Sequence, residues 1–396
     1  MKNVVILGST GSIGENTLRV IEGLPEAFRV VGLAAAKNGR RLLEQAVNFG
    51  AIHVAVSDPA EAKRCRALAP AGMKVHAGDR GVEEVAGLAD ADIVVCAVVG
   101  MAGLRPVMAA LRRGTDVALA TKEVLVVAGS IVSAACRRHG AKMLPIDSEQ
   151  SAIFQCLTGC WSTRRGMWSA RSGQAVKRLI LTASGGPFAH RKDLDFDRVT
   201  VEQALAHPNW NMGKKVTVDS ATMMNKGLEV MEAHWLFNVP IPRIDVLVHR
   251  ESIVHSLVEF VDGNLVAQLS IPDMRFAIQY ALTYPRRLDG RLPVLDLARA
   301  GALNFAEPDL MRFPCLGLAK LAGERGGTLP AVLNAANEVA VERFLAGQMM
   351  FSGIWHLVEA VMERHEVVDE PSLDVIMEAD AWARRMARTL SAKRAK

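Results

Sequence analysis

Two carboxylates stand one residue apart at Asp147-Ser148-Glu149, directly after the apolar run KMLPI. Carboxylate oxygens with no Cys or His beside them suit Mg²⁺ or Mn²⁺ better than Zn²⁺. The Asp-x-Glu spacing alone is also common in loops and helix caps, so a metal site needs a third ligand. Glu229 is our candidate, and Asp147, Glu149 and Glu229 together predict a divalent metal centre.

A second group of polar side chains surrounds Glu229 in the segment VDSATMMNKGLEVMEAHW. Asn225 and Lys226 precede it at helical spacing, so a helix places all three near one face. Ser220 is expected near the start of that helix, where a hydroxyl, an amide and a lysine suit a phosphate. The turn SGG at 184–186 offers further donors for the same anion. The alternative is a simple surface ion pair between Lys226 and Glu229.

The segment HPNWNMGKK, residues 207–215, lies inside a long, weakly patterned stretch. A long loop that carries Trp and Met among Gly and Pro is uncommon in a compact domain unless it closes on a ligand. The sequence therefore predicts a lid in which Trp210 and Met212 exclude water and His207 reaches a substrate oxygen. A single His is more often structural, which is the alternative for His207.

Three glycines, Gly8, Gly11 and Gly14, follow the first apolar run in GSTGSIG. Their place between a strand and a helix favours a dinucleotide site, in which bare backbone approaches the pyrophosphate at a helix N-terminus. The spacing is a variant of the G-x-G-x-x-G pattern, and a tight structural turn is the alternative.

The preference for NADP over NAD depends on the end of the second strand, which reads Ala35-Ala36-Lys37-Asn38. An NAD site places Asp or Glu there against the ribose 2′-hydroxyl. Lys37, helped by Asn38 and by Arg40 or Arg41, would instead bind a 2′-phosphate. The alternative for Lys37 is an exposed loop lysine.

The elements that position these residues alternate between short apolar runs and amphipathic stretches from residue 1 to about 148. This predicts an α/β fold that opens on a doubly wound, Rossmann-like parallel sheet, the cofactor domain of residues 1–148. Partly alternating strands follow, so we expect an α+β catalytic domain over 149–284 with a lid loop at about 184–214. An extended linker over 285–309 and a C-terminal helical bundle over 310–396 complete the prediction.

Composition excludes several other classes of protein. The chain has 396 residues, of which 50% are hydrophobic and 22% charged, and no apolar run is long enough to span a membrane. Six scattered cysteines indicate reduced thiols in a cytoplasmic protein. The net charge of +5 comes from the last thirteen residues, since removing their six basic residues from 47 leaves 41 against 42 acidic ones. We expect a solvated helix end there and no nucleic-acid partner.

The chain resembles the 1-deoxy-D-xylulose 5-phosphate reductoisomerase family over nearly its whole length. The resemblance depends on the motifs GSTGSIG, AKN, TKE, PIDSE, SGGPF, HPNWNMG, VDSATMMNKGLE and LNAANE. It implies a homodimeric enzyme that uses NADPH and a divalent metal, Mg²⁺, Mn²⁺ or Co²⁺. The stretch from Trp161 to Gly173 matches no motif of the family and is expected to be a surface insertion.

Carried onto matching positions, the resemblance implies roles for individual residues. Ala36 and Thr121 occupy positions where Gly and Asn are familiar in the family, and both are included among the cofactor contacts. Those contacts are Thr10, Gly11, Ser12, Ile13, Ala36, Lys37, Asn38, Thr121, Glu123 and Gly213. The metal ligands are Asp147, Glu149 and Glu229. The substrate contacts are Lys122, Ser148, Glu149, Ser184, His207, Trp210, Met212, Ser220, Asn225, Lys226 and Glu229, and the catalytic set is Lys122, Asp147, Glu149, His207 and Glu229.

The implied reaction isomerises a keto sugar phosphate to a branched aldehyde and reduces it to 2-C-methyl-D-erythritol 4-phosphate. A retro-aldol cleavage with re-addition and a direct α-ketol shift are both compatible with these residues. Two other functions are compatible with the cofactor turn alone. One is a metal-independent NADPH oxidoreductase of the semialdehyde or polyol type, and the other is an NADPH-sensing regulatory protein.

Overall fold

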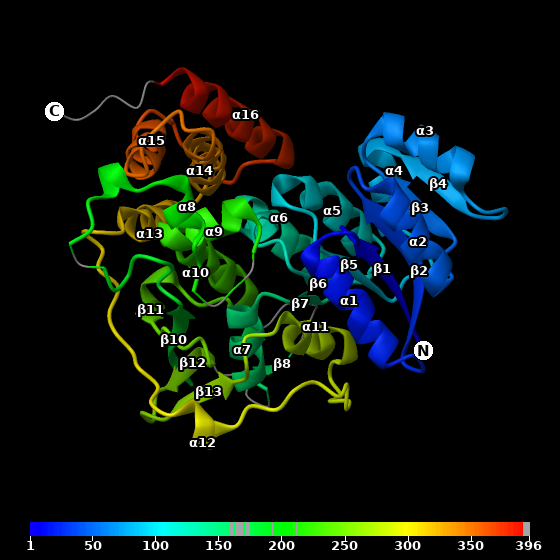
Figure 1. Cartoon of the computed structure of the whole chain (residues 1–396), viewed down its shortest axis with the longest axis horizontal. Helices are drawn as coiled ribbons and strands as arrows, with labels where there is room; N and C mark the ends of the chain where they lie inside the picture. Colours follow the sequence, from blue (N-terminus) through cyan, green and yellow to red (C-terminus); the bar gives the residue numbers. More distant parts are fainter. Residues whose placement is uncertain are drawn as a thin grey trace. The chain divides into compact units, whose positions relative to one another are not determined.

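The structure is a computed structural model and describes residues 1–158, 161–162, 169–170, 175–191, 193–208, 210 and 212–390. The chain folds into two compact units (Figure 1). The first comprises Met1–Val124, Val132–Arg171 and Asp273–Val294, and the second comprises Leu125–Ile131, Ser172–Pro272 and Leu295–Lys396. This division differs from a boundary at residue 148, because the helices that follow residue 148 and residue 273 pack on each other within the first unit.

The first unit is built on a parallel seven-stranded sheet of order β4-β3-β2-β1-β5-β6-β7, drawn in blue and cyan in Figure 1. The chain steps outward from β1 to β4, then returns to the other side of β1 for β5, β6 and β7. This reversal confirms the doubly wound prediction and puts the topological switch point between β1 and β5. The strands are β1 (Lys2–Leu7), β2 (Phe28–Ala35), β3 (His53–Val56), β4 (Lys74–Ala77), β5 (Ile93–Cys96), β6 (Asp116–Leu119) and β7 (Met143–Pro145).

The strand β4 is the one that the apolar runs did not predict. Its sequence KVHA is short and polar, and its residues are half-buried or exposed because β4 is an edge strand. The inner strands, in contrast, are nearly completely buried, and β1 buries Val4, Val5, Ile6 and Leu7 entirely. A sheet covered on both faces requires such unbroken apolar strands.

The helices that connect these strands are α1 (Ser12–Gly23), α2 (Gly39–Phe49), α3 (Pro59–Leu68), α4 (Gly78–Ala86), α5 (Leu104–Arg112) and α6 (Glu123–His139). Two further helices, α7 (Ser148–Cys156) and α11 (Met274–Thr283), come after the last of these strands in the chain. A 3₁₀ turn, η1 (Gly100–Gly103), precedes α5. Ala128 has non-helical backbone angles, so α6 is kinked there.

The second unit contains a mixed four-stranded sheet of order β11-β10-β12-β13. Its strands are β10 (Val176–Ala183), β11 (Ile244–Val248), β12 (Val254–Phe260) and β13 (Leu265–Leu269). The run IDVLVHRESIVHSLVEFV is therefore two strands, because the chain turns between Val248 and Val254 with Ser252 at φ 53°. The chain also turns between β12 and β13, where Gly263 has φ +86°.

The helices of the second unit are α8 (Val201–Leu205), α9 (Lys214–Ala221), α10 (Met224–Phe237), α12 (Leu297–Ala300), α13 (Pro314–Arg325), α14 (Leu329–Leu345), α15 (Gly353–Met362) and α16 (Leu373–Thr389). Two 3₁₀ turns, η3 (Phe196–Arg198) and η4 (Ile241–Arg243), accompany them. The last four helices agree with the predicted helical bundle, and α12 is a single short turn in the predicted linker.

Much of the predicted lid is packed rather than open. Phe188 is 1% exposed and its ring lies 5.4 Å from that of Phe351, while Phe196 stacks at 5.7 Å on the same Phe351. A capping box at Thr200 and Gln203 begins α8. These aromatic side chains thus anchor the first part of 184–214 to Phe351, just before α15, although the described residues of 184–195 and of the loop between α8 and α9 form no helix or strand.

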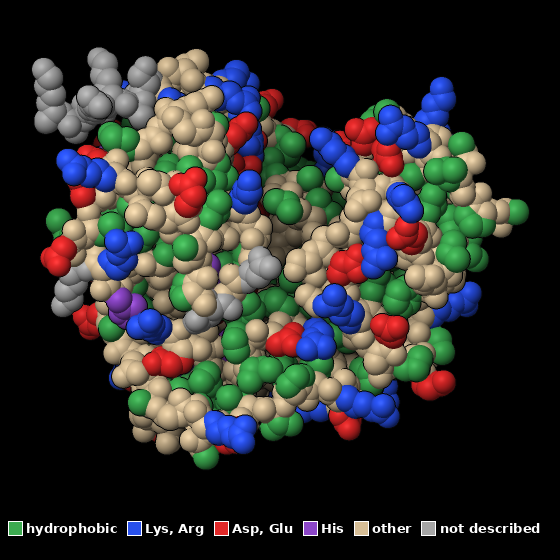
Figure 2. Space-filling model, viewed as in Figure 1, with side chains coloured by type: hydrophobic (Ala, Val, Ile, Leu, Met, Phe, Trp, Pro, Cys, Tyr) green, Lys and Arg blue, Asp and Glu red, His purple; other side chains and the backbone are tan. Residues whose placement is uncertain are grey.

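Other sequence-based expectations have mixed outcomes. The stretch from Trp161 to Gly173 lies outside the described residues except for the two-residue strands β8 (Trp161–Ser162) and β9 (Ser169–Ala170). Arg384 is not part of a solvated tail, because it pairs with Glu338 and Asp380 at 2.7 Å. Figure 2 shows basic and acidic side chains interspersed over most of the face in view.

The state of the cysteines and the character of the helices agree with the expectations from composition. The cysteines among the described residues are free thiols, and four of them are buried. Among those residues, no helix combines the length and the apolar character that crossing a membrane requires.

Candidate active site

The turn between β1 and α1 uses its three glycines for different purposes. Gly8 has φ +83°, and a Cβ there would lie 2.5 Å from the carbonyl oxygen of Ala97. A Cβ on Gly14 would lie 2.3 Å from the carbonyl oxygen of Gly8. A Cβ on Gly11 would meet nothing closer than 3.4 Å. Gly8 and Gly14 are therefore required by the fold, whereas the bare face of Gly11 points to space that a ligand can use.

The N-terminus of α1 is open to a ligand. Gly11 is its N-cap, and no side chain caps the helix. Gly11 and Ser12 are exposed, and Thr10 and Ile13 are half-buried. Uncapped N–H groups at a helix N-terminus attract an anion, so this turn fits the pyrophosphate of a dinucleotide.

The segment after β2 presents the residues predicted to select NADP. Ala36, Lys37 and Asn38 are exposed directly beyond the end of the strand. Asn38 caps α2, and its Oδ1 accepts a hydrogen bond from the backbone N–H of Arg41 at 3.3 Å. Arg40 lies 3.3 Å from Glu44 on the surface.

Arg41 has an internal partner that the sequence did not reveal. Its Nε and Nη2 donate to the two carboxylate oxygens of Glu15 at 2.7 and 2.9 Å. This pair raises the pKa of Arg41 and lowers that of Glu15, chiefly through the hydrogen bonds themselves. Arg41 therefore joins α1 to α2, whereas the Lys37 side chain is exposed beyond the end of β2.

Gln45 is a positioning residue that sequence analysis missed. It is 1% exposed, and its Nε2 donates to the carbonyl oxygen of Ser9 at 3.0 Å and to Glu15 at 2.9 Å. The side chain thus holds the glycine turn from behind. Its signal in the sequence was a polar residue on the apolar face of α2.

The loop between β6 and α6 carries the TKE motif. The Thr121 hydroxyl donates to the carbonyl oxygen of Val98 at 2.5 Å, so its side chain joins the ends of β5 and β6. Lys122 is 8% exposed, and its Nζ lies 2.6 Å from Oδ2 of Asp147. Glu123 is 7% exposed and begins α6.

Asp147 and Glu149 lie at the N-terminus of α7, immediately after β7. Asp147 occupies the N-cap position, yet its carboxylate makes no capping hydrogen bond. It faces Lys122 instead, which removes the helix-cap alternative for this residue. The Ser148 hydroxyl donates to Glu149 at 2.5 Å, and both side chains are half-buried.

In the second unit, Asn225, Lys226 and Glu229 lie on one helix, α10, as their spacing predicts, and Ser220 lies just before it on a separate helix. α9 ends at Ala221, Met223 adopts φ 61°, and α10 begins at Met224. Ser220 is thus in the last turn of α9, while Asn225 and Lys226 are in the first turn of α10. The N-terminal turn of α10 still offers the predicted amide and amine.

The SGG turn packs directly on this break. Gly186 has φ +60°, and a Cβ there would lie 2.8 Å from the carbonyl oxygen of Ser220. Only glycine permits this approach, so the turn brings Ser184 and Ser220 into the same region. The two groups of anion donors predicted from separate motifs are therefore neighbours.

His207 lies beside the same turn. Its Nδ1 accepts the backbone N–H of Trp210 at 3.0 Å, so the neutral ring carries its proton on Nε2, 2.9 Å from the Ser184 hydroxyl. Burial lowers the pKa of His207. Trp210 and Met212 are half-buried and Gly213 is exposed at the start of α9, while Asn209 and Asn211 lie outside the described residues.

Glu229 accepts hydrogen bonds from Asn225, at 2.5 Å, and from Lys226. The side chains of Lys226 and Glu229 are 4% and 0% exposed. The ion pair considered as an alternative is thus present, but it is buried. A buried carboxylate requires strong compensation, which supports a site built to hold charge rather than a solvated surface pair.

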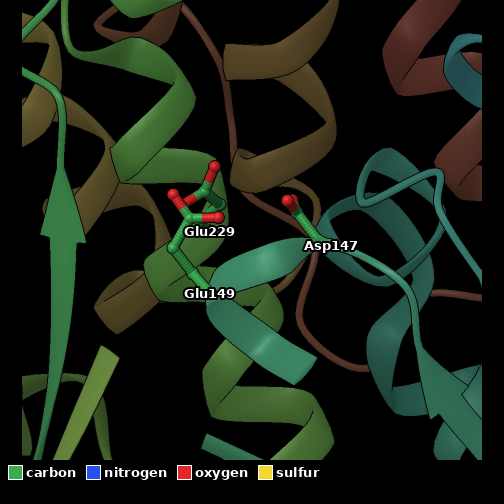
Figure 3. Close-up of side chains that lie close together, drawn as sticks. All are labelled: Asp147, Glu149 and Glu229. Atoms are coloured by element: carbon green, nitrogen blue, oxygen red, sulfur yellow. The ribbon is translucent and has the colours of Figure 1, made fainter. Parts of the chain in front are cut away.

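Asp147, Glu149 and Glu229 form the one group of three or more possible metal ligands found among the described residues, and one ligand atom from each lies within 4.8 Å of the others. Figure 3 shows the three carboxylates close together. Oxygen donors alone suit Mg²⁺ or Mn²⁺.

A parallel sheet with an open dinucleotide turn at its switch point and carboxylates after its last strand defines an NADP-type oxidoreductase with a metal-suited polar site. Models of 1-deoxy-D-xylulose 5-phosphate reductoisomerase match residues 4–129, and two models of its C-terminal domains match 143–237 and 269–386. The chain belongs to the 1-deoxy-D-xylulose 5-phosphate reductoisomerase family.

Relatives of that name cover the whole chain. The protein of Pelotomaculum thermopropionicum is 52% identical over 98% of this chain and 97% of its own length. The solved reductoisomerase of Zymomonas mobilis, in complex with NADPH, is 39% identical with a TM-score of 0.89 over 98% of both chains. A further reductoisomerase structure, with NADPH, fosmidomycin and magnesium, is 38% identical with a TM-score of 0.89 over 98% of both chains.

Proposed function

We propose that this chain converts 1-deoxy-D-xylulose 5-phosphate to 2-C-methyl-D-erythritol 4-phosphate, with NADPH as reductant and a divalent metal, Mg²⁺, Mn²⁺ or Co²⁺. The observation that carries this function lies on the seven-stranded sheet. An open helix N-terminus follows β1, and a carboxylate pair that caps no helix follows β7. A metal-dependent reduction needs a site for the reductant and a site for the metal, and both follow the carboxyl ends of strands in this one sheet.

The cofactor fits the first unit at the switch point between β1 and β5. The uncapped turn at Gly11 and Ser12 receives the pyrophosphate, and Lys37 with Asn38 binds the 2′-phosphate. NADPH supplies the hydride when it is bound. Gln45 and the Glu15–Arg41 pair hold the turn in place.

The metal fits the carboxylates of Asp147, Glu149 and Glu229. When bound, a divalent metal polarises the ketone and offsets negative charge that develops on neighbouring substrate oxygens. Lys122 pairs with Asp147, and the Ser148 hydroxyl donates to Glu149. In the second unit, Asn225 and Lys226 donate hydrogen bonds to the buried carboxylate of Glu229.

The substrate phosphate is bound by donors that belong to the second unit. They are the hydroxyls of Ser184 and Ser220, the amide of Asn225 and the ammonium group of Lys226. His207 donates from Nε2 toward Ser184, which orients that hydroxyl. A phosphate held this way supplies binding energy remote from the reacting carbons.

Proton transfer falls to Lys122 and Glu149. The Lys122 ammonium group lies 2.6 Å from Asp147, and we assign to it the hydrogen bond and proton donated to a substrate oxygen. Glu149 is half-buried and can accept a proton from a substrate hydroxyl. Trp210, Met212 and Gly213, on the loop before α9, are the residues that we assign to closure over the substrate.

We place the protein in the cytoplasm as a homodimer. The sheet edge β13 exposes Leu265 and Val266, which are 55% and 41% exposed, and an apolar edge strand favours a partner. The apolar run at 244–261 is a weaker candidate for the interface, because its strand β12 already pairs with β10 on one side and β13 on the other. Sedimentation of wild type and of Val266→Lys tests the dimer, since the charge should dissociate it.

Two NADPH-consumption assays, one with Mg²⁺ and one with EDTA added, test the reaction. Purified chain with 1-deoxy-D-xylulose 5-phosphate and Mg²⁺ should consume NADPH, followed by absorbance, and EDTA should stop it. Asp147→Asn should lose at least roughly 100-fold in rate, since a metal contributes several kcal/mol, while it still binds NADPH. Asp193→Asn, an exposed acid, is the matched control and should keep full rate. Unimpaired turnover in EDTA would favour a metal-independent oxidoreductase, and NADPH binding without turnover would favour a sensor.

A further inference from the structure

Two histidines face each other on the edge of the first unit's sheet, far along the strand order from β7. His53 begins β3 and His76 is in β4, and Nδ1 of His53 lies 3.2 Å from Nε2 of His76. Their rings are stacked with centroids 5.5 Å apart. Both side chains are half-buried, so their nitrogens are partly withdrawn from water yet reachable.

The third member of this cluster is Glu84 on α4. Its Oε2 lies 3.0 Å from Nδ1 of His76. Hydrogen bonding from His76 lowers the pKa of Glu84, so the carboxylate accepts and His76 donates from Nδ1. The lone pair of His76 is then on Nε2, the nitrogen that faces His53. A carboxylate that fixes the tautomer of a histidine in this way is a recurrent support of metal-ligating imidazoles.

The separation of the two nitrogens matches that of two ligands on one ion. Metal–nitrogen bonds of about 2.0–2.1 Å at a tetrahedral angle put the two nitrogens roughly 3.3 Å apart. His53 needs only to carry its proton on Nε2 rather than Nδ1, a change of tautomer with no loss of a proton from the ring. We propose that His53 and His76, supported by Glu84, form a binding site for a transition-metal cation such as Zn²⁺, Ni²⁺ or Cu²⁺.

The surroundings of His53 favour the neutral, ligating form of that ring. Burial, followed by the charges of Lys74 and His76, lowers the pKa of His53. Glu84 supplies a negative charge on the side of His76, and Arg80 lies 3.4 Å from Glu84 at the surface. Water would complete the coordination, because the only group of three or more possible ligand side chains found among the described residues is Asp147, Glu149 and Glu229.

This site differs in chemistry from the carboxylate centre. Imidazole suits Zn²⁺, Ni²⁺ and Cu²⁺, whereas three carboxylates suit Mg²⁺ and Mn²⁺. The two sites lie on opposite flanks of the strand order, with β3 and β4 at one edge and β7 at the other. An ion shared by His53 and His76 would cross-link the four-residue edge strand β4 to β3 and stabilise it.

Titration of the full-length, untagged chain with Ni²⁺ by calorimetry, in saturating Mg²⁺ to occupy the carboxylates, tests the site. We expect one ion per chain in wild type, loss of that binding in His53→Gln and His76→Gln, and affinity weakened about 10–100-fold in Glu84→Gln. His356→Gln, which removes an exposed histidine of α15, is the matched control and should bind as wild type.

A Cu²⁺ electron paramagnetic resonance spectrum gives an independent measurement. Coupling to two nitrogens in wild type and to one in either single variant supports the site. Wild-type binding in His53→Gln, or coupling to a single nitrogen in wild type, overturns it. If a variant unfolds, protection of both His53 and His76 from diethylpyrocarbonate by Ni²⁺ in wild type decides the matter, and equal modification with and without Ni²⁺ refutes the proposal.

Discussion

The side-chain amide of Asn337 donates to Oδ1 of Asp219 at 2.8 Å, and both residues are almost completely buried. Asn337 belongs to the LNAANE motif of α14, and Asp219 precedes Ser220 on α9. Lys215 lies 2.8 Å from the other oxygen of Asp219. The helical bundle thus fixes the helix end from which Ser220 projects.

Asn337→Ala should therefore affect both stability and substrate affinity. Loss of the donor leaves a buried carboxylate oxygen unsatisfied, which costs about 1–3 kcal/mol. Urea unfolding should show that loss, and KM for the sugar phosphate should rise more than kcat falls, because Ser220 binds rather than reacts. Asn48→Ala, at an exposed position of α2, should change neither quantity. A kcat defect with an unchanged KM would contradict this account.

Lys37→Ala should change cofactor selectivity without affecting the fold. A hydrogen bond to a charged group contributes about 1.5–3 kcal/mol, so kcat/KM for NADPH should fall roughly 10–150-fold. The value for NADH should stay as in wild type, since NADH lacks the 2′-phosphate. Steady-state kinetics with both cofactors measure this, and Lys63→Ala, at an exposed site on α3, is the control. An equal loss for NADPH and NADH would remove Lys37 from the specificity site.

Gly186→Ala should weaken substrate binding, whereas the same substitution at Gly263, another glycine with positive φ, should not. Both Gly186 and Gly263 have positive φ, so alanine costs each about 1–2 kcal/mol of backbone strain. A Cβ at Gly186 would also meet the Ser220 carbonyl at 2.8 Å, whereas at Gly263 nothing lies within 4 Å. Gly186→Ala should therefore raise KM for the substrate, and Gly263→Ala should leave it unchanged. Equal KM values in the two variants would refute the packing of the SGG turn on α9.

His207 predicts a dependence of stability on pH. Burial lowers its pKa from the ordinary value of 6.5, so the unfolded chain binds a proton at a higher pH than the folded chain does. The stability that neutral His207 contributes is present above that ordinary value and is lost as the pH falls through the lowered one. Protonation also converts Nδ1 to a donor and breaks its bond from Trp210.

Urea unfolding at a series of pH values tests this dependence. His207→Gln should show a smaller loss of unfolding free energy than wild type as the pH falls from about 7 to 5. His356→Gln should retain the full wild-type loss, because that side chain is exposed. Identical profiles for wild type and His207→Gln would show that His207 does not titrate differently in the folded protein.

Several features of the site could be predicted from local sequence. Gly8, Gly11 and Gly14 could be placed because a strand, a glycine turn and a helix are consecutive in the chain. Asp147 and Glu149 could be placed because they end the apolar run of β7. In both cases, the position of the residue at a strand end decides its role.

Other features depend on contacts between distant segments. Arg41 was a candidate to help bind the 2′-phosphate, and only the tertiary structure shows that it donates hydrogen bonds to Glu15 on the preceding helix. The helix expected over Asn225 and Glu229 is present, but nothing in the spacing of VDSATMMNKGLE marks Met223 as the break that puts Ser220 on a separate helix, α9. His53 and His76 share no sequence motif, and only the pairing of β3 with β4 brings them together.

The sequence by itself determined the fold class, the cofactor turn and the residues that could carry a phosphate and a metal, because these follow from the periodicity and chemistry of neighbouring residues. The tertiary structure decided which of the candidate side chains have another partner. In the folded chain Arg41 donates hydrogen bonds to Glu15, Thr121 donates to Val98, and Asn337 donates to Asp219. These pairs cannot be predicted from sequence spacing, because they depend on distances between segments that are far apart in the chain.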